Sequence, residues 1–181
     1  VRYDASMLNS LYAFLETIHG KIGERTQTGD KKVIIQSAPI NVELSIDDFH
    51  SLVKHMILEQ TYFVRLVEGK MTIKDELLFW AQENAQHTEL VAHLLPPGDL
   101  KNQAVEIADS LKRTRVLANY DEVYFSDELS TIKRSNGVAG VVHAAVHTGQ
   151  IRTINDAMLE HEMREGQKGE QRVQYLLGLL Q

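Results

Sequence analysis

Apolar residues recur at helical spacing along most of this chain of 181 residues, and proline hardly interrupts them. There are only three prolines, and two of them are adjacent. Because proline inside a helix removes a hydrogen bond and kinks the backbone, their scarcity permits long helices. Six helices are expected, over residues 5–22, 45–69, 72–95, 100–119, 126–147 and 153–179. Short connections favour antiparallel neighbours, so the predicted fold class is all-α, a ferritin-like antiparallel bundle of about six helices.

Local signals at the ends of these segments refine the prediction. Thr72 and Asp75 have the spacing of a capping box, which predicts a helix that starts directly after Thr72. Residues 24–44 are expected to form a linker, with a short extended piece at 33–35. The Asn-Gly pair that ends at Gly137 is expected to kink or split the fifth helix.

Composition excludes several classes of function. The formal net charge is −6 and both signs are spread along the chain, so a basic surface for nucleic acid is not expected. Cysteine is absent, which excludes disulfides and thiolate metal sites. The longest apolar runs are far too short for a membrane span, and no signal segment opens the chain, so the cytoplasm is the expected location. The chain begins with Val1, and whether it is a fragment or a processed product is left open.

The chain also contains an internal repeat. Residues 18–22 resemble residues 146–151, and each copy precedes a helix with the pattern His-x-x-x-Glu. We therefore expect two versions of one helical hairpin, with two further helices between them. The predicted organisation is a hairpin over residues 1–70 and a four-helix ferritin-like bundle over residues 71–181.

Ionisable residues occur within the apolar stripes of three helices. Residues four apart on a helix lie on one face, about 6 Å apart along the axis, so a His and a Glu at that spacing can reach one ion. A carboxylate on an apolar face must be protonated, paired with a cation or bound to a metal. The candidates for metal ligands are the pairs His55 and Glu59, Glu83 and His87, and His161 and Glu165, together with Glu76 on the same face as Glu83.

Three such pairs are explained together if they converge on a metal. We expect a mononuclear or dinuclear centre, with iron or manganese favoured over zinc. His143 and His147 form a His-x-x-x-His pair whose role the sequence leaves open, as it does for Glu16 and His19. A hydrogen-bonded or surface role remains the alternative for any single pair.

Two longer motifs resemble a known family. Glu76-Leu77-Leu78-Phe79-Trp80 followed by His87 is similar to the opening helix of the bacterial family of unknown function numbered 2935. Gly149-Gln150-Ile151 leading into Glu160-His161-Glu162-Met163-Arg164-Glu165 is similar to its closing helix, and His55-Met56-Ile57-Leu58-Glu59 looks like a second closing helix. The resemblance implies tandem ferritin-like bundles, of which residues 1–70 would be the second half of a first bundle. It implies a metal site but no particular reaction.

The function expected from the residues is metal binding, with dioxygen or peroxide as co-substrate if the centre is redox-active. Whether the protein is an enzyme is left open. One alternative is a non-catalytic interaction or structural module, which includes a homo-oligomer, and another is a hemerythrin-like carrier of oxygen or metal. Burial of the paired residues in a shared interior would favour the metal site, whereas pairing with arginine would favour the structural module.

Overall fold

A computed structural model describes residues 32–37, 40–118, 124–154 and 156–180. The chain divides into two compact units, Val1–Met71 and Thr72–Gln181, which we call the N-terminal and the C-terminal unit. This division falls one residue from the boundary expected from the sequence. The predicted first helix, over residues 5–22, lies outside the described residues, as do Glu16 and His19.

The N-terminal unit contains a β-hairpin followed by a helix. Strands β1 (Lys32–Ser37) and β2 (Ile40–Ser45) pair antiparallel, with Lys32 opposite Ser45. The expected extended piece at 33–35 lies in β1, but its partner strand was not predicted. Helix α2 (Ile46–Val67) follows directly. It ends where Gly69 adopts a φ of 67°, a left-handed conformation that glycine accepts without strain.

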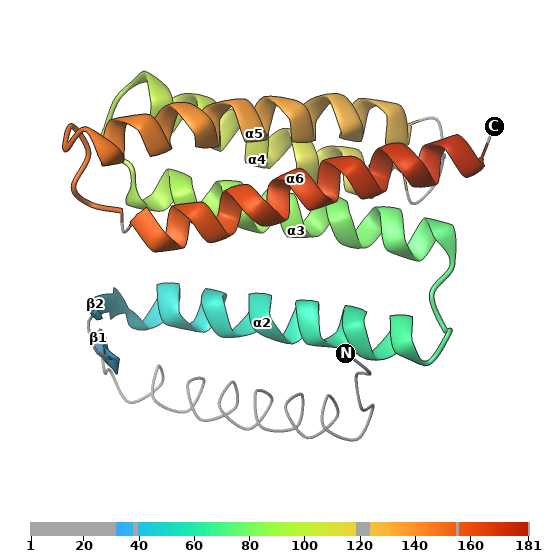
Figure 1. Ribbon diagram of the computed structural model, residues 1–181, viewed down its shortest axis with the longest axis horizontal. Helices are drawn as coiled ribbons and strands as arrows, with labels where there is room; N and C mark the ends of the chain where they lie inside the picture. The colour runs from blue at the N-terminus through green and yellow to red at the C-terminus, as the bar shows by residue number, and fades with distance from the viewer. Residues whose placement is uncertain (1–31, 38–39, 119–123, 155, 181) are drawn as a thin grey trace. The chain divides into compact units, whose positions relative to one another are not determined.

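The C-terminal unit is a four-helix bundle. Its helices are α3 (Ile73–Leu94), α4 (Asp99–Ala118), α5 (Phe125–His147) and α6 (Asp156–Leu179). Each runs antiparallel to the next, as Figure 1 shows, and α6 also packs against α3. Within the described residues, the regular structure is therefore helical apart from the hairpin, which agrees with the predicted all-α bundle.

Most helix boundaries in this unit agree with the sequence. The predicted capping box is present: Thr72 Oγ1 accepts a hydrogen bond from the Asp75 amide, and Asp75 Oδ2 accepts one from the Thr72 amide. A cap of this kind stabilises a helix by about 1 kcal/mol. Helix α6 begins at Asp156, three residues later than the predicted start at Thr153.

Helix α5 is continuous through Gly137, so the predicted split does not occur. An interior glycine costs a helix only about 1 kcal/mol, which tertiary packing readily offsets. The neighbouring Asn136 does not compete with its own helix for hydrogen bonds. Its amide nitrogen donates instead to Gly166 O and to Glu170 Oε2 on α6.

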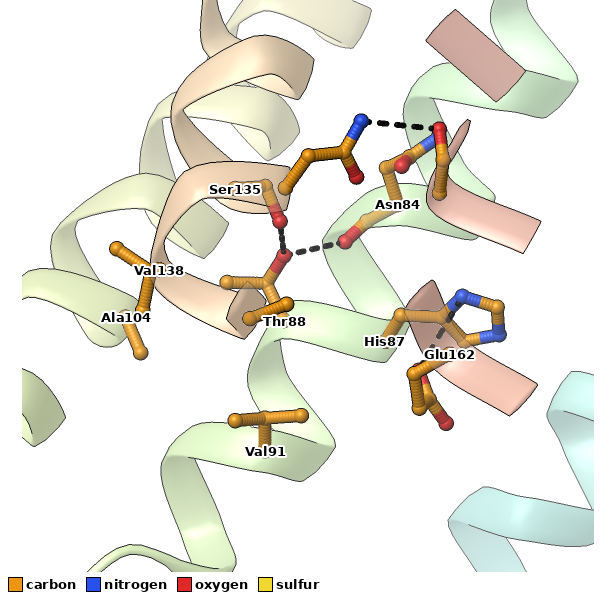
Figure 2. A pocket seen from close by; sticks show the side chains of 11 residues that line it. Asn84, His87, Thr88, Val91, Ala104, Ser135, Val138 and Glu162 are labelled. Carbon is orange, nitrogen blue, oxygen red and sulfur yellow. Dashed lines mark hydrogen bonds and ion pairs between the residues drawn. The ribbon is translucent and has the colours of Figure 1, made fainter. Parts of the chain in front are cut away.

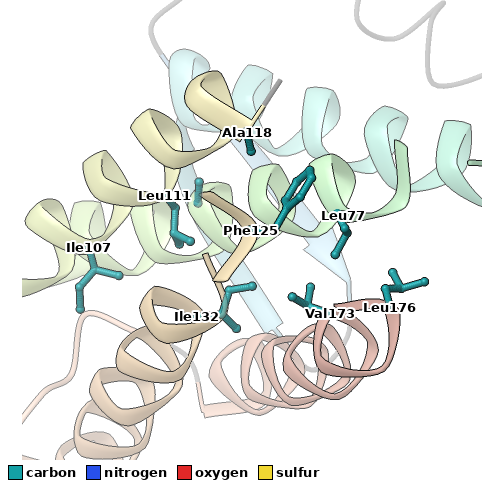
Figure 3. Packing of buried hydrophobic residues seen from close by; sticks show 9 residues of the cluster. Leu77, Ile107, Leu111, Ala118, Phe125, Ile132, Val173 and Leu176 are labelled. Atoms are coloured by element: carbon teal, nitrogen blue, oxygen red, sulfur yellow. The ribbon is translucent and has the colours of Figure 1, made fainter. Parts of the chain in front are cut away.

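Two clusters of buried apolar side chains fill the bundle. In the first, residues from all four helices point toward one another, as Figure 3 shows; they include Leu77, Leu111, Phe125, Ile132 and Val173. The second contains Val91, Ala104, Val142, Ile154 and Leu159 among others. These clusters fix the register of α3 against α6. Among the described helices, none has a stretch long and apolar enough to span a membrane.

Candidate metal centre

Two predicted ligands lie four residues apart on α3 and are both buried. Glu83 is 2% exposed and His87 is 6% exposed. Their spacing places them on one face of the helix, where Glu83 Oε1 lies 3.3 Å from His87 Nε2. A buried carboxylate requires a proton, a counter-charge or a metal. The sequence predicted Glu83 as a ligand because its carboxylate would be buried, and Glu83 is buried.

Helix α6 brings three further candidate ligands within one turn. Glu162 is buried, Glu165 is partly buried, and the side chain of His161 is exposed. His161 Nε2 lies 3.3 Å from Glu165 Oε2. The two residues of this predicted pair therefore contact each other. The carboxylate of Glu165 lies toward the interior of the bundle, next to His87.

Two glycines allow α6 to approach its neighbours closely enough to place these side chains. A Cβ atom at Gly166 would overlap the side-chain oxygen of Asn136 on α5. A Cβ atom at Gly169 would lie 2.8 Å from Asn84 Nδ2 and 2.9 Å from the ring of Trp80 on α3. Real Cβ atoms do not approach other groups this closely, so a larger residue at either position would require α6 or the facing side chains to shift.

The imidazole of His87 is the centre of the cluster. Its Nε2 atom lies 3.3 Å from Glu83 Oε1 and 3.4 Å from Glu165 Oε2. Its Nδ1 atom lies 3.2 Å from Glu162 Oε2, the contact drawn in Figure 2. The ring of His161 stands edge-on to it, with 6.2 Å between centroids. One histidine thus faces carboxylates from both α3 and α6.

These distances fit a shared metal ion. Ligand atoms at about 2.0–2.1 Å from a tetrahedral ion lie roughly 3.3–3.4 Å from one another, whereas charge-assisted hydrogen bonds measure about 2.7–2.9 Å. The contacts of His87 Nε2, at 3.3 and 3.4 Å, match the first value. A neutral imidazole nitrogen also carries at most one hydrogen, which cannot point at two carboxylates at once. A cation between them would contact all three groups at once.

The formal charge of the cluster also favours a bound cation. Glu83, Glu162 and Glu165 contribute a formal charge of −3 when ionised, while two neutral imidazoles contribute none. Gathering like charges in a partly dry interior is costly unless a cation accompanies them or protons neutralise them. A divalent ion would remove most of this repulsion. Glu162 would then accept a hydrogen bond from His87 Nδ1, the nitrogen that does not face the ion. Histidine ligands of metals usually have a carboxylate or carbonyl partner in this position.

Glu76, a further predicted ligand, has a different environment. Its two carboxylate oxygens accept hydrogen bonds from Arg172 Nε and a terminal nitrogen of Arg172, at 2.7 and 2.8 Å. The pair joins the first turn of α3 to α6, and Glu76 is 4% exposed. Arginine thus supplies the cation that this carboxylate needs, through the forked geometry that such pairs favour.

His55 and Glu59 lie in the N-terminal unit, on α2. His55 Nε2 and Glu59 Oε2 are 4.0 Å apart, as expected for residues four apart on one helix face. The prediction that this pair binds metal stays a prediction.

Sequence reasoning missed Glu162. It follows His161 directly and precedes Glu165 by three residues, so it lies near the same helix face as Glu165. Its burial could not be read from the sequence, because charged neighbours surround it in residues 160–165. The signal that could have found it is its position one turn after the apolar Met158 and Leu159.

A small pocket inside the bundle borders the cluster. His87 and Glu162 lie on its wall, beside Asn84, Thr88 and Ser135, as Figure 2 shows. Thr88 Oγ1 and Ser135 Oγ are 2.6 Å apart, and Thr88 Oγ1 also donates to Asn84 O. The pocket leaves about 20 Å³ for molecules of the size of water. That space suits a single water-sized molecule.

Comparison of the chain with protein-family models, with curated proteins and with solved structures finds no match. The resemblance to the family numbered 2935 therefore stays a prediction from the motifs.

Proposed function

We propose that the C-terminal unit is a ferritin-like bundle that binds a transition metal through Glu83, His87, His161 and Glu165. The observation that carries the proposal is the position of His87 Nε2 between carboxylates of two helices. Glu162 orients His87 from its other nitrogen. The ligand atoms of Glu83, His87 and Glu165 all lie within 4.8 Å of one another, so small torsional changes suffice to close them around an ion.

Iron or manganese stays the expected metal of this site. Carboxylate oxygens and imidazole nitrogens suit both ions, and zinc also accepts them. A bound iron or manganese ion with open coordination positions would supply chemistry with dioxygen or peroxide. The residues of the chain would bind the ion, and the pocket beside His87 would admit only a very small molecule. Glu162 is placed to hold or release a proton at His87 Nδ1.

A structural module is the second candidate. The pair of Glu76 and Arg172 supports it, because a buried carboxylate of this bundle is neutralised there without a metal. In that case protonated His87 and His161 would neutralise the remaining carboxylates. If Glu83, Glu162 and Glu165 are ionised, their formal charge is −3, and the two protonated histidines supply only +2. One negative charge would then remain without a counter-charge within the cluster.

Metal analysis of the purified full chain tests the proposal. After expression with added iron, manganese and zinc, we expect about one or two equivalents of metal at the central site, the content of a mononuclear or dinuclear centre. His87→Ala and Glu165→Gln should each remove the central metal, whereas His93→Ala, at an exposed position of α3, should retain it. A wild-type protein without metal under these conditions would contradict the proposal. His55→Ala tests the prediction for the N-terminal unit separately.

A further inference from the structure

A second group of possible metal ligands lies where α5 ends and α6 begins. His143 and His147 occupy the last two turns of α5, and their rings stack with 6.3 Å between centroids. Asp156 and Glu160 occupy the first two turns of α6. None of these four residues belongs to the cluster around His87. Two imidazoles and two carboxylates from adjoining helices thus meet at one end of the bundle.

The distances within this group resemble those around a shared ion. His143 Nε2 lies 3.4 Å from Asp156 Oδ1, and His147 Nδ1 lies 3.9 Å from Asp156 Oδ2. Ligand atoms of His143, Asp156 and Glu160 all lie within 4.8 Å of one another. Ligands of one tetrahedral ion are separated by about 3.3–3.4 Å, so the contact between His143 and Asp156 already has this spacing, and the other ligand atoms would have to move closer to bind the same ion.

Two atoms of the group are buried without a hydrogen-bond partner among the described residues. They are His143 Nε2 and Asp156 Oδ1, which face each other. A buried polar atom without a partner is costly, and native proteins seldom leave two of them in contact. An ion between the nitrogen and the oxygen would satisfy both.

The backbone holds these side chains in place. The amides of Gln150 and Gly149 donate to Ala145 O and Val146 O, and Gly149 has a φ of 75°, which is the Schellman ending of a helix. Buried Ile154 and Leu159 anchor the start of α6 in the second core cluster. A site on two anchored helix ends loses little freedom on binding an ion.

We infer that His143, His147, Asp156 and Glu160 form a second metal site, for a zinc-type divalent ion, that clamps the end of α5 to the start of α6. Imidazole nitrogens together with carboxylate oxygens are a common zinc set. The side chain of His147 is 76% exposed, so the ion can enter directly from solvent. The site is independent of the centre proposed around His87.

Equilibrium dialysis of the metal-free full chain against Zn²⁺ tests the inference. Replacing both His143 and His147 with Ala should remove one equivalent of zinc, while His93→Ala should remove none. The double variant His87→Ala with Glu165→Gln should retain this equivalent, which separates the second site from the central one. An unchanged zinc count in the His143 and His147 variant would overturn the inference and leave only an ion pair between His143 and Asp156.

A gentler variant guards against loss of folding. His147 is mostly exposed, so His147→Ala should leave the helical circular dichroism unchanged. It should weaken zinc binding at the second site by at least the roughly 10- to 100-fold that loss of an outer partner costs. Zinc affinity equal to that of the wild type would also overturn the inference.

Discussion

The Nε2 atom of His87, on α3, lies 3.4 Å from Oε2 of Glu165, on α6. These two helices are the first and the last of the bundle, and no short connection joins them. A metal ion bound by both residues would therefore cross-link the two ends of the C-terminal unit. Metal binding and folding stability should be coupled through this contact.

Removing the metal should destabilise the C-terminal unit. A ligand that binds only the folded state adds about 2.7 kcal/mol to the free energy of unfolding when present at 100 times its dissociation constant. We expect a chelator to lower the melting temperature of the wild type, followed by circular dichroism. In a background of His143→Ala and His147→Ala, which removes the second site, Glu165→Gln should melt at the same temperature with and without metal.

A matched control separates this effect from loss of any surface charge. Glu89, on α3, pairs with Lys112 at 2.7 Å and is exposed. Glu89→Gln should change stability little, because exposed ion pairs contribute about 0–1 kcal/mol, and the chelator effect should persist. A chelator effect that survives in Glu165→Gln, in the background without His143 and His147, would show that Glu165 does not bind the metal.

The pair of Glu76 and Arg172 predicts a large effect on stability without an effect on the metal. Arg172→Met would leave a buried carboxylate without its counter-charge, which costs about 3–5 kcal/mol. The side chain of Arg172 is 39% exposed, so we expect the lower end of this range. Urea unfolding measures it, and metal content should equal that of the wild type.

A second variant tests whether Glu76 has any other role. Replacing Glu76 with Leu and Arg172 with Met together should recover most of the lost stability, because an apolar pair can substitute for a buried ion pair. Its metal content should also be unchanged. Loss of metal in this double variant would indicate that Glu76 binds the metal, as the sequence predicted.

The sequence predicted the helices of the bundle well where local signals exist. The capping box of Thr72 and Asp75 set the start of α3 correctly, because both hydrogen bonds form within four residues. At α6 the Thr153 signal was misleading, and the helix starts at Asp156. Buried Ile151 and Ile154 anchor residues 151–154 outside the helix, a tertiary effect that no local pattern reveals.

The partners of the buried carboxylates could not be predicted from the sequence. Glu76 and Glu83 lie seven residues apart on one face of α3, so periodicity treats them alike. One meets Arg172, 96 residues away, and the other lies beside His87 and its partners on α6. That difference depends on the register between α3 and α6, which the packing around Gly166 and Gly169 fixes.

Gly166→Ala should disturb both stability and the metal centre. The added Cβ would overlap Asn136, so α6 or the Asn136 side chain must shift. Such overpacking costs about 1–3 kcal/mol, and a shift of α6 would move Glu165 away from His87. We expect a lower free energy of unfolding and weaker metal binding, measured by urea unfolding and by dialysis.

Gly178→Ala is the matched control on the same helix. No atom of the described residues lies within 4 Å of a Cβ at Gly178. Because alanine favours helices over glycine by about 1 kcal/mol, this variant should be as stable as the wild type or slightly more stable. Equal effects of both substitutions would refute the proposed role of close packing at Gly166.

Glu128 should make stability depend on pH. It lies on α5 with no exposed surface, and burial raises the pKa of its carboxyl from 4.5 to about 9. The folded state therefore holds a proton that the unfolded chain releases above pH 4.5. Its contribution to stability is complete below pH 4.5 and declines as pH rises through 9, by at most about 1.4 kcal/mol per pH unit.

Glu128→Gln isolates this contribution because an amide is neutral at every pH. The free energy of unfolding, measured with urea at pH 5, 7 and 9 in the presence of a chelator, should fall less steeply for the variant than for the wild type. The variant should be the more stable of the two at pH 9, where the wild type must ionise a buried group or unfold. Asp127→Asn, at the exposed neighbouring position, should keep the wild-type slope. Parallel curves for wild type and Glu128→Gln would mean that Glu128 is already ionised in the folded protein and is held there by a cation.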